Sequence, residues 1–516
     1  MSVVKRVVSG SLASWMRIAV TIFSQILAVP VYLHYWSIET YGAWILVQSI
    51  VSFLTIFDIA HHNYLGNEVL KIGDQKRDEI AAVFSTGMLV ALIISVVTFT
   101  IICALTLSGT ISHWVGIDAA TVRPFETALL LTCGTWVLTI TFTGLLGRVL
   151  NPFGYFPLSA WSGVVFAIVS TAASVMAVYF GAGLVATTIA TCVVIFICHS
   201  TLTVVLLRLA RQEKLVTNKI ELAKGFSRFY ASLALGAQSG LEILRQQGIR
   251  FILLPLSGMA QMIAFSTMRT GANLALQGVG SITAPLMPEL MSFLVTRDQA
   301  KAESAFSVIW LMLCAVLVPA VLIVQYLAPT LFPLWTQGKI EFDPILFALL
   351  SLAVLVCALS QPAIAVVTGN NLIKEQVMTS IVATVITVGG IYLLVPPMGI
   401  KGAALALLAG EVSSLTFYVH AAKKWLAGVT MRWPASAFGN ASMSLAVAAL
   451  GMASIIVLQK HAGICLAVAL TVQIFILIAY WSQLPLIARQ AAATQAHRFL
   501  SRLSWKRREK SVGSAS

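Results

Sequence analysis

The chain has 516 residues, of which 59% are hydrophobic and only 10% are charged. So few polar side chains cannot cover a water-soluble globule, which excludes a soluble enzyme or binding module. The formal net charge of +14 favours contact with anionic lipid, and we expect no nucleic-acid partner for so apolar a chain.

Apolar runs of membrane length follow one another almost from end to end of the chain. Lys5 and Arg6 precede the first run, which is too long for the apolar region of a cleaved signal peptide, so we expect it to remain as an anchor. The runs predict an all-α polytopic membrane protein with about 14 transmembrane helices, at residues 9–33, 42–64, 81–107, 124–146, 158–180, 184–207, 228–254, 260–288, 305–328, 344–367, 377–395, 402–420, 436–458 and 462–484.

The lysines and arginines predict the orientation of these helices. With the N-terminus in the cytoplasm, 25 of the 33 basic residues fall in inner segments, four in outer segments and four within the spans. An excess of this size on one side is typical of the cytoplasmic face of a membrane protein. We therefore expect both termini to be cytoplasmic.

Polar residues recur at 0, 3, 7 and 11 in several predicted helices, a spacing that keeps them on one helix face at about 100° per residue. A charge at membrane depth costs on the order of 2.5 to 3.5 kcal/mol, so such stripes must face protein or water. The stripes comprise Ser14, Arg17, Thr21 and Gln25 in the first span; Ser239, Glu242, Gln246 and Arg250, with Arg245 at the margin, in the seventh; and Ser266, Arg269, Asn273 and Gln277 in the eighth.

Short similarities at offsets of 218 to 225 residues indicate an internal duplication. Ser11-Leu12-Ala13 recurs as Ser232-Leu233-Ala234, and subtracting 225 from the seventh-span stripe gives the positions of the first. Because six helices return the chain to its starting side, the two halves are expected to be parallel repeats. We predict six-helix lobes at 1–210 and 225–421, two additional helices at 436–484 and a basic cytoplasmic tail at 485–516.

Four arginines within the predicted spans exceed the two nearby carboxylates, Glu242 and Asp58. Hydrogen bonding across a dry interface explains Ser, Thr and Asn in such stripes, but it does not tolerate excess charge. We therefore predict a wet cavity that receives an anion, for which guanidinium is a suitable donor. Its candidate residues are Arg17, Arg245, Arg250, Arg269, Gln25, Gln246 and Asn273.

Asp58 in the second span has two interpretations, structural pairing with an arginine and protonation during transport. Asp58 and Glu242 are our candidates for coupling to a proton or sodium ion. Nucleotide-binding, hydrolase and metal-binding motifs are missing from the sequence, so we expect no cofactor, no metal site and no catalytic residue.

Three segments resemble the Wzx-type O-antigen and polysaccharide flippases of the multidrug, oligosaccharidyl-lipid and polysaccharide exporter superfamily. They are Phe57-Asp58-Ile59-Ala60 followed by Asn63 and Glu68; Pro288-Glu289-Leu290 followed by Arg297-Asp298; and Gly399-Ile400-Lys401-Gly402-Ala403-Ala404. Ala60 stands where that family usually has glycine, which puts close helix packing in question there. The resemblance implies two six-helix bundles around a central cavity in the bacterial inner membrane.

The resemblance also implies a function, the movement of a polyprenyl-pyrophosphate-linked oligosaccharide across the cytoplasmic membrane for surface polysaccharide synthesis. Expected partners are membrane lipids and a polysaccharide polymerase or export protein, with the transporter itself a monomer. Ion-coupled efflux of drugs or small solutes is the alternative on the same architecture, although cationic drugs would favour acidic residues. A glycan polymerase or glycosyltransferase would need catalytic carboxylates in a sizeable outer loop, and the predicted loops are short.

Overall fold

The computed structural model describes residues 3–72, 76–217, 219–283, 286–485 and 489. These residues form helices and no strand, and eleven helical segments are long and apolar enough to cross a membrane. The predicted fold class, an all-α polytopic membrane protein, is confirmed. The predicted basic tail at 485–516 lies almost wholly outside the described residues.

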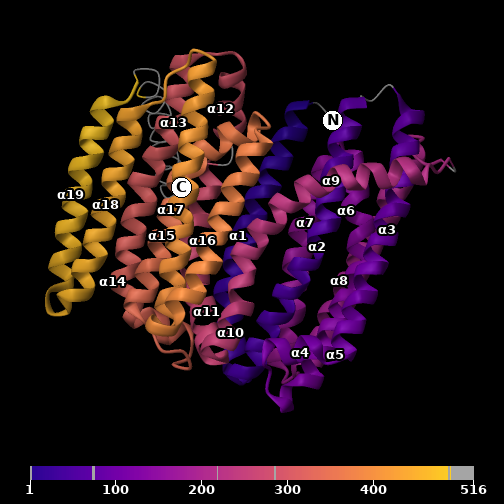
Figure 1. Ribbon diagram of the computed structural model, residues 1–516, viewed down its shortest axis with the longest axis horizontal. Helices are drawn as coiled ribbons and strands as arrows, with labels where there is room; N and C mark the ends of the chain where they lie inside the picture. The colour runs from indigo at the N-terminus through magenta and orange to yellow at the C-terminus, as the bar shows by residue number, and fades with distance from the viewer. Residues whose placement is uncertain (1–2, 73–75, 218, 284–285, 486–488, 490–516) are drawn as a thin grey trace, which may run out of the picture. The chain divides into compact units, whose positions relative to one another are not determined.

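Figure 1 labels the helices in chain order. The first part of the chain contains α1 (Val3–Tyr35), α2 (Ile38–Ile72), α3 (Arg77–Leu107), α4 (Thr110–Val115), α5 (Ala119–Thr135), η1 (Trp136–Ile140), α6 (Thr141–Leu150), η2 (Asn151–Tyr155), α7 (Phe156–Tyr179), α8 (Leu184–Gln212), α9 (Leu222–Ile243), η3 (Leu244–Gly248), α10 (Ile249–Ser257) and α11 (Met259–Thr283). The remainder contains α12 (Leu286–Val295), α13 (Gln299–Met312), η4 (Leu313–Leu317), α14 (Val318–Trp335), α15 (Pro344–Gly369), α16 (Ile373–Met398), α17 (Ile400–Gly428), α18 (Ala435–Val457), η5 (Gln459–His461) and α19 (Ala462–Gln483).

The eleven apolar segments account for twelve of the fourteen predicted spans, because Ala119–Tyr179 contains two of them. Within it, Gly154 in η2 has a φ of 94°, a left-handed conformation that glycine adopts readily, at the junction of α6 and α7. The two remaining spans, 228–254 and 260–288, coincide largely with α9 to α10 and with α11. They are helical but fall outside the apolar set, in keeping with their polar stripes.

The helices form two compact units. The first comprises the described residues up to Gly278 together with Ala328–Leu350 and Val377–Gly410; the second comprises Val279–Leu327, Ser351–Gln376 and the described residues from Glu411 onward. The duplicated lobes at 1–210 and 225–421 and the separate pair at 436–484 stay predictions. All the candidate site residues belong to the first unit.

In the first unit, α2 and α9 pack along each other with their directions opposed. Glu68 near the end of α2 accepts a 2.9 Å hydrogen bond from Arg228 near the start of α9. Beyond the far end of α9, the ring of Phe53 packs against that of Phe251 at an interplanar angle of 58°. A Cβ at Gly236 would lie 3.2 Å from the Cβ of Ala60. α2 and α9 therefore pack closely at Ala60, and the glycine that permits this is Gly236 on α9.

In the second unit, buried polar side chains of α19 bond to neighbouring helices. On α19, Gln473 donates to the carbonyl of Cys314 at 2.7 Å and Tyr480 donates to the carbonyl of Ser307 at 2.8 Å. Asp298 caps α13 by accepting a 3.1 Å hydrogen bond from the backbone N–H of Lys301. The Arg297-Asp298 pair, one of the features that resemble the flippase family, thus lies directly before α13.

Two glycines of the Gly399–Ala404 segment allow α16 and α17 to turn and to pack closely. Gly399 joins α16 to α17 with a φ of 61°, a left-handed conformation that disfavours side chains. Gly402 lies in the first turn of α17, where an added Cβ would overlap the backbone carbonyl of Leu394 on α16. The helices can pack this closely only because Gly402 has no side chain.

We expect Gly402→Ala to lower the melting temperature of the purified protein, because the methyl group meets rigid backbone and overpacking costs about 1–3 kcal/mol. Gly389→Ala on α16 is the matched control: the added Cβ meets open space, and alanine favours a helix by about 1 kcal/mol over glycine. Thermal unfolding of both variants in detergent checks this. Equal melting temperatures would contradict the packing described for Gly402.

Candidate functional site

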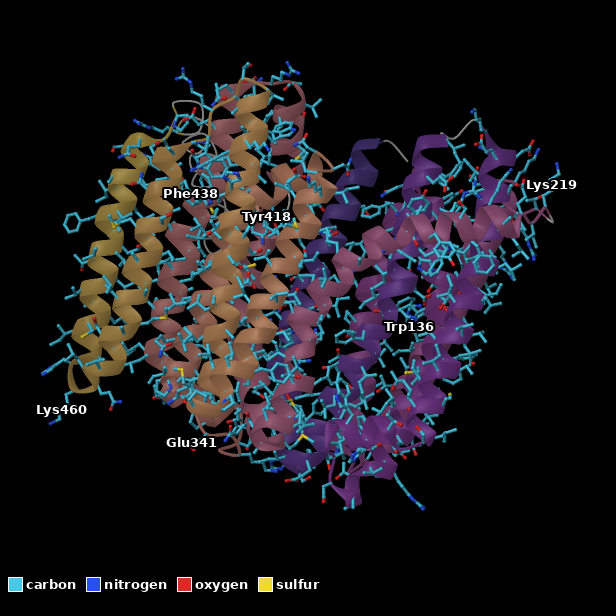
Figure 2. All side chains as sticks on the ribbon, in the orientation of Figure 1. Trp136, Lys219, Glu341, Tyr418, Phe438 and Lys460 are labelled. Atoms are coloured by element: carbon cyan, nitrogen blue, oxygen red, sulfur yellow. The ribbon has the colours of Figure 1, made fainter. Side chains whose placement is uncertain are left out.

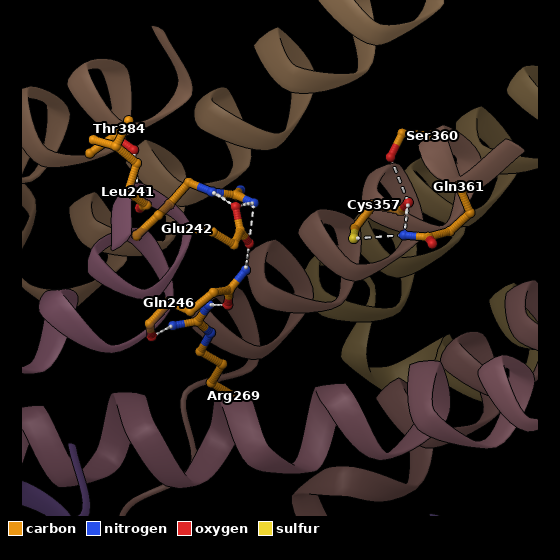
Figure 3. Close-up of polar contacts among 9 residues, drawn as sticks. Leu241, Glu242, Gln246, Arg269, Cys357, Ser360, Gln361 and Thr384 are labelled. Atoms are coloured by element: carbon orange, nitrogen blue, oxygen red, sulfur yellow. Dashed lines mark hydrogen bonds and ion pairs between the residues drawn. The ribbon is translucent and has the colours of Figure 1, made fainter. Parts of the chain in front are cut away.

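The polar stripes of the seventh and eighth predicted spans meet in the structure. Arg269 on α11 donates to the backbone carbonyl of Gln246 at 2.7 Å and also to the side-chain oxygen of Gln246. Gln246 in turn donates to Glu242 at 3.0 Å. Figure 3 shows this chain of contacts from Arg269 through Gln246 to Glu242. Three of the predicted site residues therefore contact one another, while their role in binding a substrate stays a prediction.

Arg245 and Glu242 form an ion pair within this cluster. The guanidinium donates to both carboxylate oxygens of Glu242, at 2.7 and 2.8 Å. The Arg245 side chain is buried, with 6% exposed, whereas that of Glu242 is 46% exposed. Because Glu242 balances the charge of Arg245, these two residues add no net positive charge to the predicted site.

The π-helical turn η3 divides the seventh-span stripe. Such a turn holds one extra residue, which rotates all later residues by about 100° relative to a continuous α-helix. Arg250 follows η3 and points to α2, where it donates to the Ser49 hydroxyl at 2.7 Å; it also donates to Gln247 at 2.7 Å. The single face expected for Glu242, Gln246 and Arg250 is therefore two faces, one toward α11 and one toward α2.

The first-span stripe lies on α1, which packs along α7. Arg17 is exposed, and a Cβ at Gly163 of α7 would lie 3.6 Å from its Cδ. In the described part of the chain, the Arg17 guanidinium makes no hydrogen bond or ion pair. Gln25, two turns further along, accepts a 3.2 Å hydrogen bond from Gln277 and so connects this stripe to α11. Asn273 is half-buried on α11, one turn from Arg269.

These contacts locate the charge available to a ligand. Among the four arginines, Arg245 is balanced by a carboxylate, and Arg269 is buried and bonded to Gln246. Arg250 is half-buried and bonded to two neutral oxygens, and Arg17 is exposed. A guanidinium with neutral partners keeps its full charge and can exchange a neutral hydrogen bond for a stronger one to an anion. Arg269 also has a neutral described partner but is buried, so Arg17 and Arg250 are the arginines that are both accessible and without a described carboxylate.

Asp58 lies apart from the arginines. Its buried carboxylate accepts hydrogen bonds from Ser95 on α3 at 2.9 Å, from the Trp136 indole at 2.9 Å and from the Thr141 hydroxyl at 3.0 Å. All of these donors are neutral, so in the described residues the contacts do not show the arginine pairing considered for Asp58. Ser95, Trp136 and Thr141 were not predicted as site residues, because in sequence they are ordinary members of apolar spans.

No protein-family model matches the sequence, and no curated protein is similar to it in sequence. Solved structures do share its fold. An inward-facing multidrug resistance MATE family transporter of the MOP superfamily has a TM-score of 0.64 at 14% identity, covering 82% of this chain and 98% of its own. A MATE transporter from Vibrio cholerae has a TM-score of 0.57 at 12% identity, covering 82% and 97% of the two chains.

A MOP superfamily transporter from Pyrococcus furiosus is also similar, with a TM-score of 0.55 at 13% identity, covering 83% of this chain and 96% of that one. It is described as having a binding pocket of reverse polarity that suggests a different function. Since identities this low support the architecture alone, the conclusion concerns the fold: the chain has the fold of MATE transporters of the MOP superfamily.

Proposed function

We propose that the chain is a membrane transporter that carries a polyprenyl-pyrophosphate-linked oligosaccharide from the cytoplasmic to the outer leaflet of the bacterial inner membrane. The observation that carries this proposal is the presence of Arg17 and Arg250 in predicted membrane spans without a carboxylate partner among the described contacts. Charges this costly to bury are characteristic of substrate sites in membrane proteins. Their sign calls for an anionic group on the substrate.

A pyrophosphate fits the chemistry of these side chains. Guanidinium presents a planar fork of donors that stays charged at all physiological pH values, and it binds phosphate oxygens in pairs. Arg250 holds Ser49 by a single 2.7 Å hydrogen bond, a contact that a phosphate oxygen could replace. The hydroxyl groups of a glycan would need polar side chains near the arginines, and Gln25, Gln246 and Asn273 are the candidates for this role.

Alternating access would require α2 and α9 to separate. Their contacts extend from the Glu68–Arg228 ion pair at 2.9 Å to the Arg250–Ser49 hydrogen bond. Rocking of rigid helix bundles breaks such contacts together, so the ion pair and the substrate-binding arginine respond to one motion. Under this proposal the protein works as a monomer, with both termini in the cytoplasm, and delivers glycan to a polymerase or export protein.

Efflux of drugs or other small solutes is the second candidate, and the comparisons favour it. The similar structures are described as multidrug or MATE transporters. The P. furiosus relative shows that structures of this fold are not all described as multidrug carriers. The charges of Arg17 and Arg250 favour an anionic cargo in either case, which would distinguish this chain from a carrier of cationic drugs.

The first functional prediction concerns Arg17 and Arg250. We expect Arg17→Ala and Arg250→Ala each to slow flipping of a fluorescent lipid-linked oligosaccharide in proteoliposomes about ten- to hundredfold. Each substitution removes hydrogen bonds to a charged group, which contribute about 1.5–3 kcal/mol apiece. Arg250→Lys keeps the charge but loses the paired donors, so its rate should be intermediate.

Arg123→Ala is the control for these substitutions, because it removes an exposed arginine near the start of α5. It should flip at the wild-type rate. Normal flipping by Arg17→Ala and Arg250→Ala, at equal amounts of folded protein, would show that these arginines do not hold the pyrophosphate.

A second prediction separates the two candidate functions. Cells that express the protein should gain no resistance to a panel of cationic dyes, because the exposed charge of the site repels cations. Competition in proteoliposomes gives the complementary measurement: polyprenyl pyrophosphate should inhibit flipping, whereas cationic dyes should not. Resistance to the dyes, lost in an Arg250→Ala strain, would instead support efflux.

A third prediction concerns the ion pair of Glu242 and Arg245. Because Arg245 is buried, Glu242→Gln removes the carboxylate that is described beside its charge and should lower the melting temperature. The double variant Glu242→Gln with Arg245→Gln should recover most of this loss, since it removes both charges. Thermal unfolding of the two single variants and the double variant measures the coupling. Additive losses would show that the two charges do not stabilise each other.

A further inference from the structure

Arg148 is a charged residue of the first unit that the proposed substrate site does not use. The predicted fourth span ends before it, yet α6 continues through it to Leu150 and passes into η2 and α7. Arg148 is half-buried, and its guanidinium donates to the side-chain oxygen of Asn63 on α2 at 2.7 Å and to the carbonyl of Gly144 at 3.5 Å. Both acceptors are neutral. In the part of the chain that the structure describes, no carboxylate pairs with Arg148.

The packing of α2 on α6 determines where this guanidinium lies. A Cβ at Gly66 of α2 would come within 3.3 Å of the Arg148 Cβ and 3.7 Å of its Cδ, so α2 covers the aliphatic stem of the arginine. One turn earlier on α2, Asn63 accepts the hydrogen bond from the end of that stem. A long basic side chain commonly buries its stem in this way and keeps its charge accessible. The charge of Arg148 therefore lies at the edge of the contact between the two helices.

Two exposed asparagines on α2 add neutral donors to this charge. Asn63 and Asn67 are one turn apart, so they lie on one face of the helix. Because the side-chain oxygen of Asn63 is bonded to Arg148, both of its amide N–H donors remain for another acceptor. Asn67 makes no side-chain hydrogen bond with any described residue. Arg148, Asn63 and Asn67 thus form a group that is rich in donors and carries one positive charge.

Glu68 follows directly on α2, but its carboxylate faces another helix. Successive residues point about 100° apart, so Glu68 lies on a different side of α2 from Asn67. Its carboxylate accepts the 2.9 Å hydrogen bond of Arg228 on α9. The negative charge of Glu68 is therefore balanced by Arg228 and leaves the charge of Arg148 available.

The asparagines share a face of α2 with the serine that contacts Arg250. Asn63 and Asn67 follow Ser49 by 14 and 18 residues, which places them within about 40° of Ser49 around a regular helix. At a rise of 1.5 Å per residue, Asn63 lies about 21 Å from Ser49 along the axis. One face of α2 therefore meets Arg250 at one end and Arg148 at the other.

α9 covers the middle of this face and leaves the asparagines open. Ile56 and Ala60 lie between the two ends, and added Cβ atoms at Gly240 and Gly236 of α9 would approach them to 3.6 and 3.2 Å. Closer to the start of α9, its Arg228 turns to Glu68, on the other side of α2. The side chains of Asn63 and Asn67 consequently stay exposed although α9 runs along the same helix.

A phosphate-bearing anion fits the chemistry of this group. Guanidinium donates to phosphate oxygens in pairs, and such charge-assisted hydrogen bonds are stronger than those to the neutral oxygens that Arg148 now contacts. The amides of Asn63 and Asn67 can donate to further oxygens of the same anion. A pyrophosphate and the headgroup of an anionic phospholipid both present this chemistry.

We propose that Arg148, Asn63 and Asn67 form a second anion site, at the predicted cytoplasmic end of α2, that binds a phosphate group. Its role as a loading site, which would hold the pyrophosphate of the substrate before Arg250 does, rests on the proposed function. The binding of phosphate itself does not. Because the two ends of this face are about 21 Å apart, one pyrophosphate cannot occupy both, and the sites would be filled in succession.

The test titrates inorganic pyrophosphate into the purified full-length chain, freed of phospholipid in a neutral detergent, by isothermal titration calorimetry. The double variant Arg17→Ala with Arg250→Ala removes the arginines of the proposed substrate site and should still bind pyrophosphate. Adding Arg148→Gln to it should weaken this binding about tenfold or more, because a charged donor is lost. Arg148→Lys keeps the charge but loses the planar fork, so its affinity should be intermediate.

A second variant keeps the test decisive if Arg148→Gln fails to fold. Asn67→Asp places a negative charge beside the guanidinium at an exposed position, and it should weaken pyrophosphate binding about threefold or more by repulsion. Asn371→Asp adds the same charge at an exposed turn between α15 and α16 and is its control. Lys219→Gln is the control for Arg148→Gln, since it removes an exposed positive charge from the connection between α8 and α9, where Figure 2 labels it.

A comparison of lipids identifies the source of the phosphate. The same titration is repeated in nanodiscs of phosphatidylcholine and in nanodiscs that also contain phosphatidylglycerol. Weaker pyrophosphate binding in the presence of phosphatidylglycerol, in the wild type but not in Arg148→Gln, assigns the site to a phospholipid headgroup. Equal binding in both nanodiscs assigns it to a free or substrate-borne pyrophosphate.

The outcomes separate this inference from the proposed function. The second site is wrong if the double variant Arg17→Ala with Arg250→Ala binds no pyrophosphate, or if Arg148→Gln and Asn67→Asp change the affinity no more than their controls do. Flipping that depends on Arg17 and Arg250 would then leave the proposed function intact. Conversely, pyrophosphate binding that requires Arg148 supports the second site even if Arg17→Ala and Arg250→Ala flip normally.

Discussion

The cost of placing charge inside a membrane is the constraint on which this structure depends. Each charged side chain at membrane depth must find an opposite charge, several neutral hydrogen bonds or water. Arg245 is paired with an opposite charge, Glu242. Asp58 instead accepts neutral hydrogen bonds from Ser95, Trp136 and Thr141. Arg250 has neutral partners and is only half-buried. These different solutions separate groups that stabilise the fold from groups that can bind ligands.

The π-helical turns η1 and η3 determine which partners the neighbouring polar side chains reach. η3 places Arg250 on a different face from Glu242 and Gln246. Arg250 therefore contacts α2, whereas Gln246 contacts α11. η1 brings Trp136 and Thr141 to one carboxylate oxygen. A π-helical turn lengthens or breaks regular hydrogen bonds, a cost that ordinary helix packing does not require. Two further π-helical turns, η2 and η4, contain no charged residue, so such turns are not confined to the charged clusters. At η1 and η3 their consequence is the position of the polar side chains.

Much of the architecture could be predicted from periodicity and length. Apolar runs predicted the helices, because that signal is local. The 0, 3, 7, 11 spacing predicted polar helix faces, whereas the contact of Arg269 with Gln246 depends on how α11 packs. The loss of the single face at Arg250 could not be predicted, since Leu244-Arg245-Gln246-Gln247-Gly248 contains nothing that marks a π-helical turn. The donors to Asp58 were missed for a related reason. They come from α3, η1 and α6, and only tertiary packing brings Ser95, Trp136 and Thr141 together.

The contacts of α2 connect the two charged clusters. Ser49 bonds Arg250 on one side of this helix, and Asp58, nine residues later, bonds α3, η1 and α6 on another. Small residues opposite α9, including Ala60 against Gly236, allow a close but weakly interdigitated contact. α2 also packs into the hydrophobic core of the first unit through Leu65 and Val69. The carboxylate of Asp58 and the hydroxyl of Ser49 are therefore attached to one firmly packed helix, and a displacement of this helix would move both contacts together.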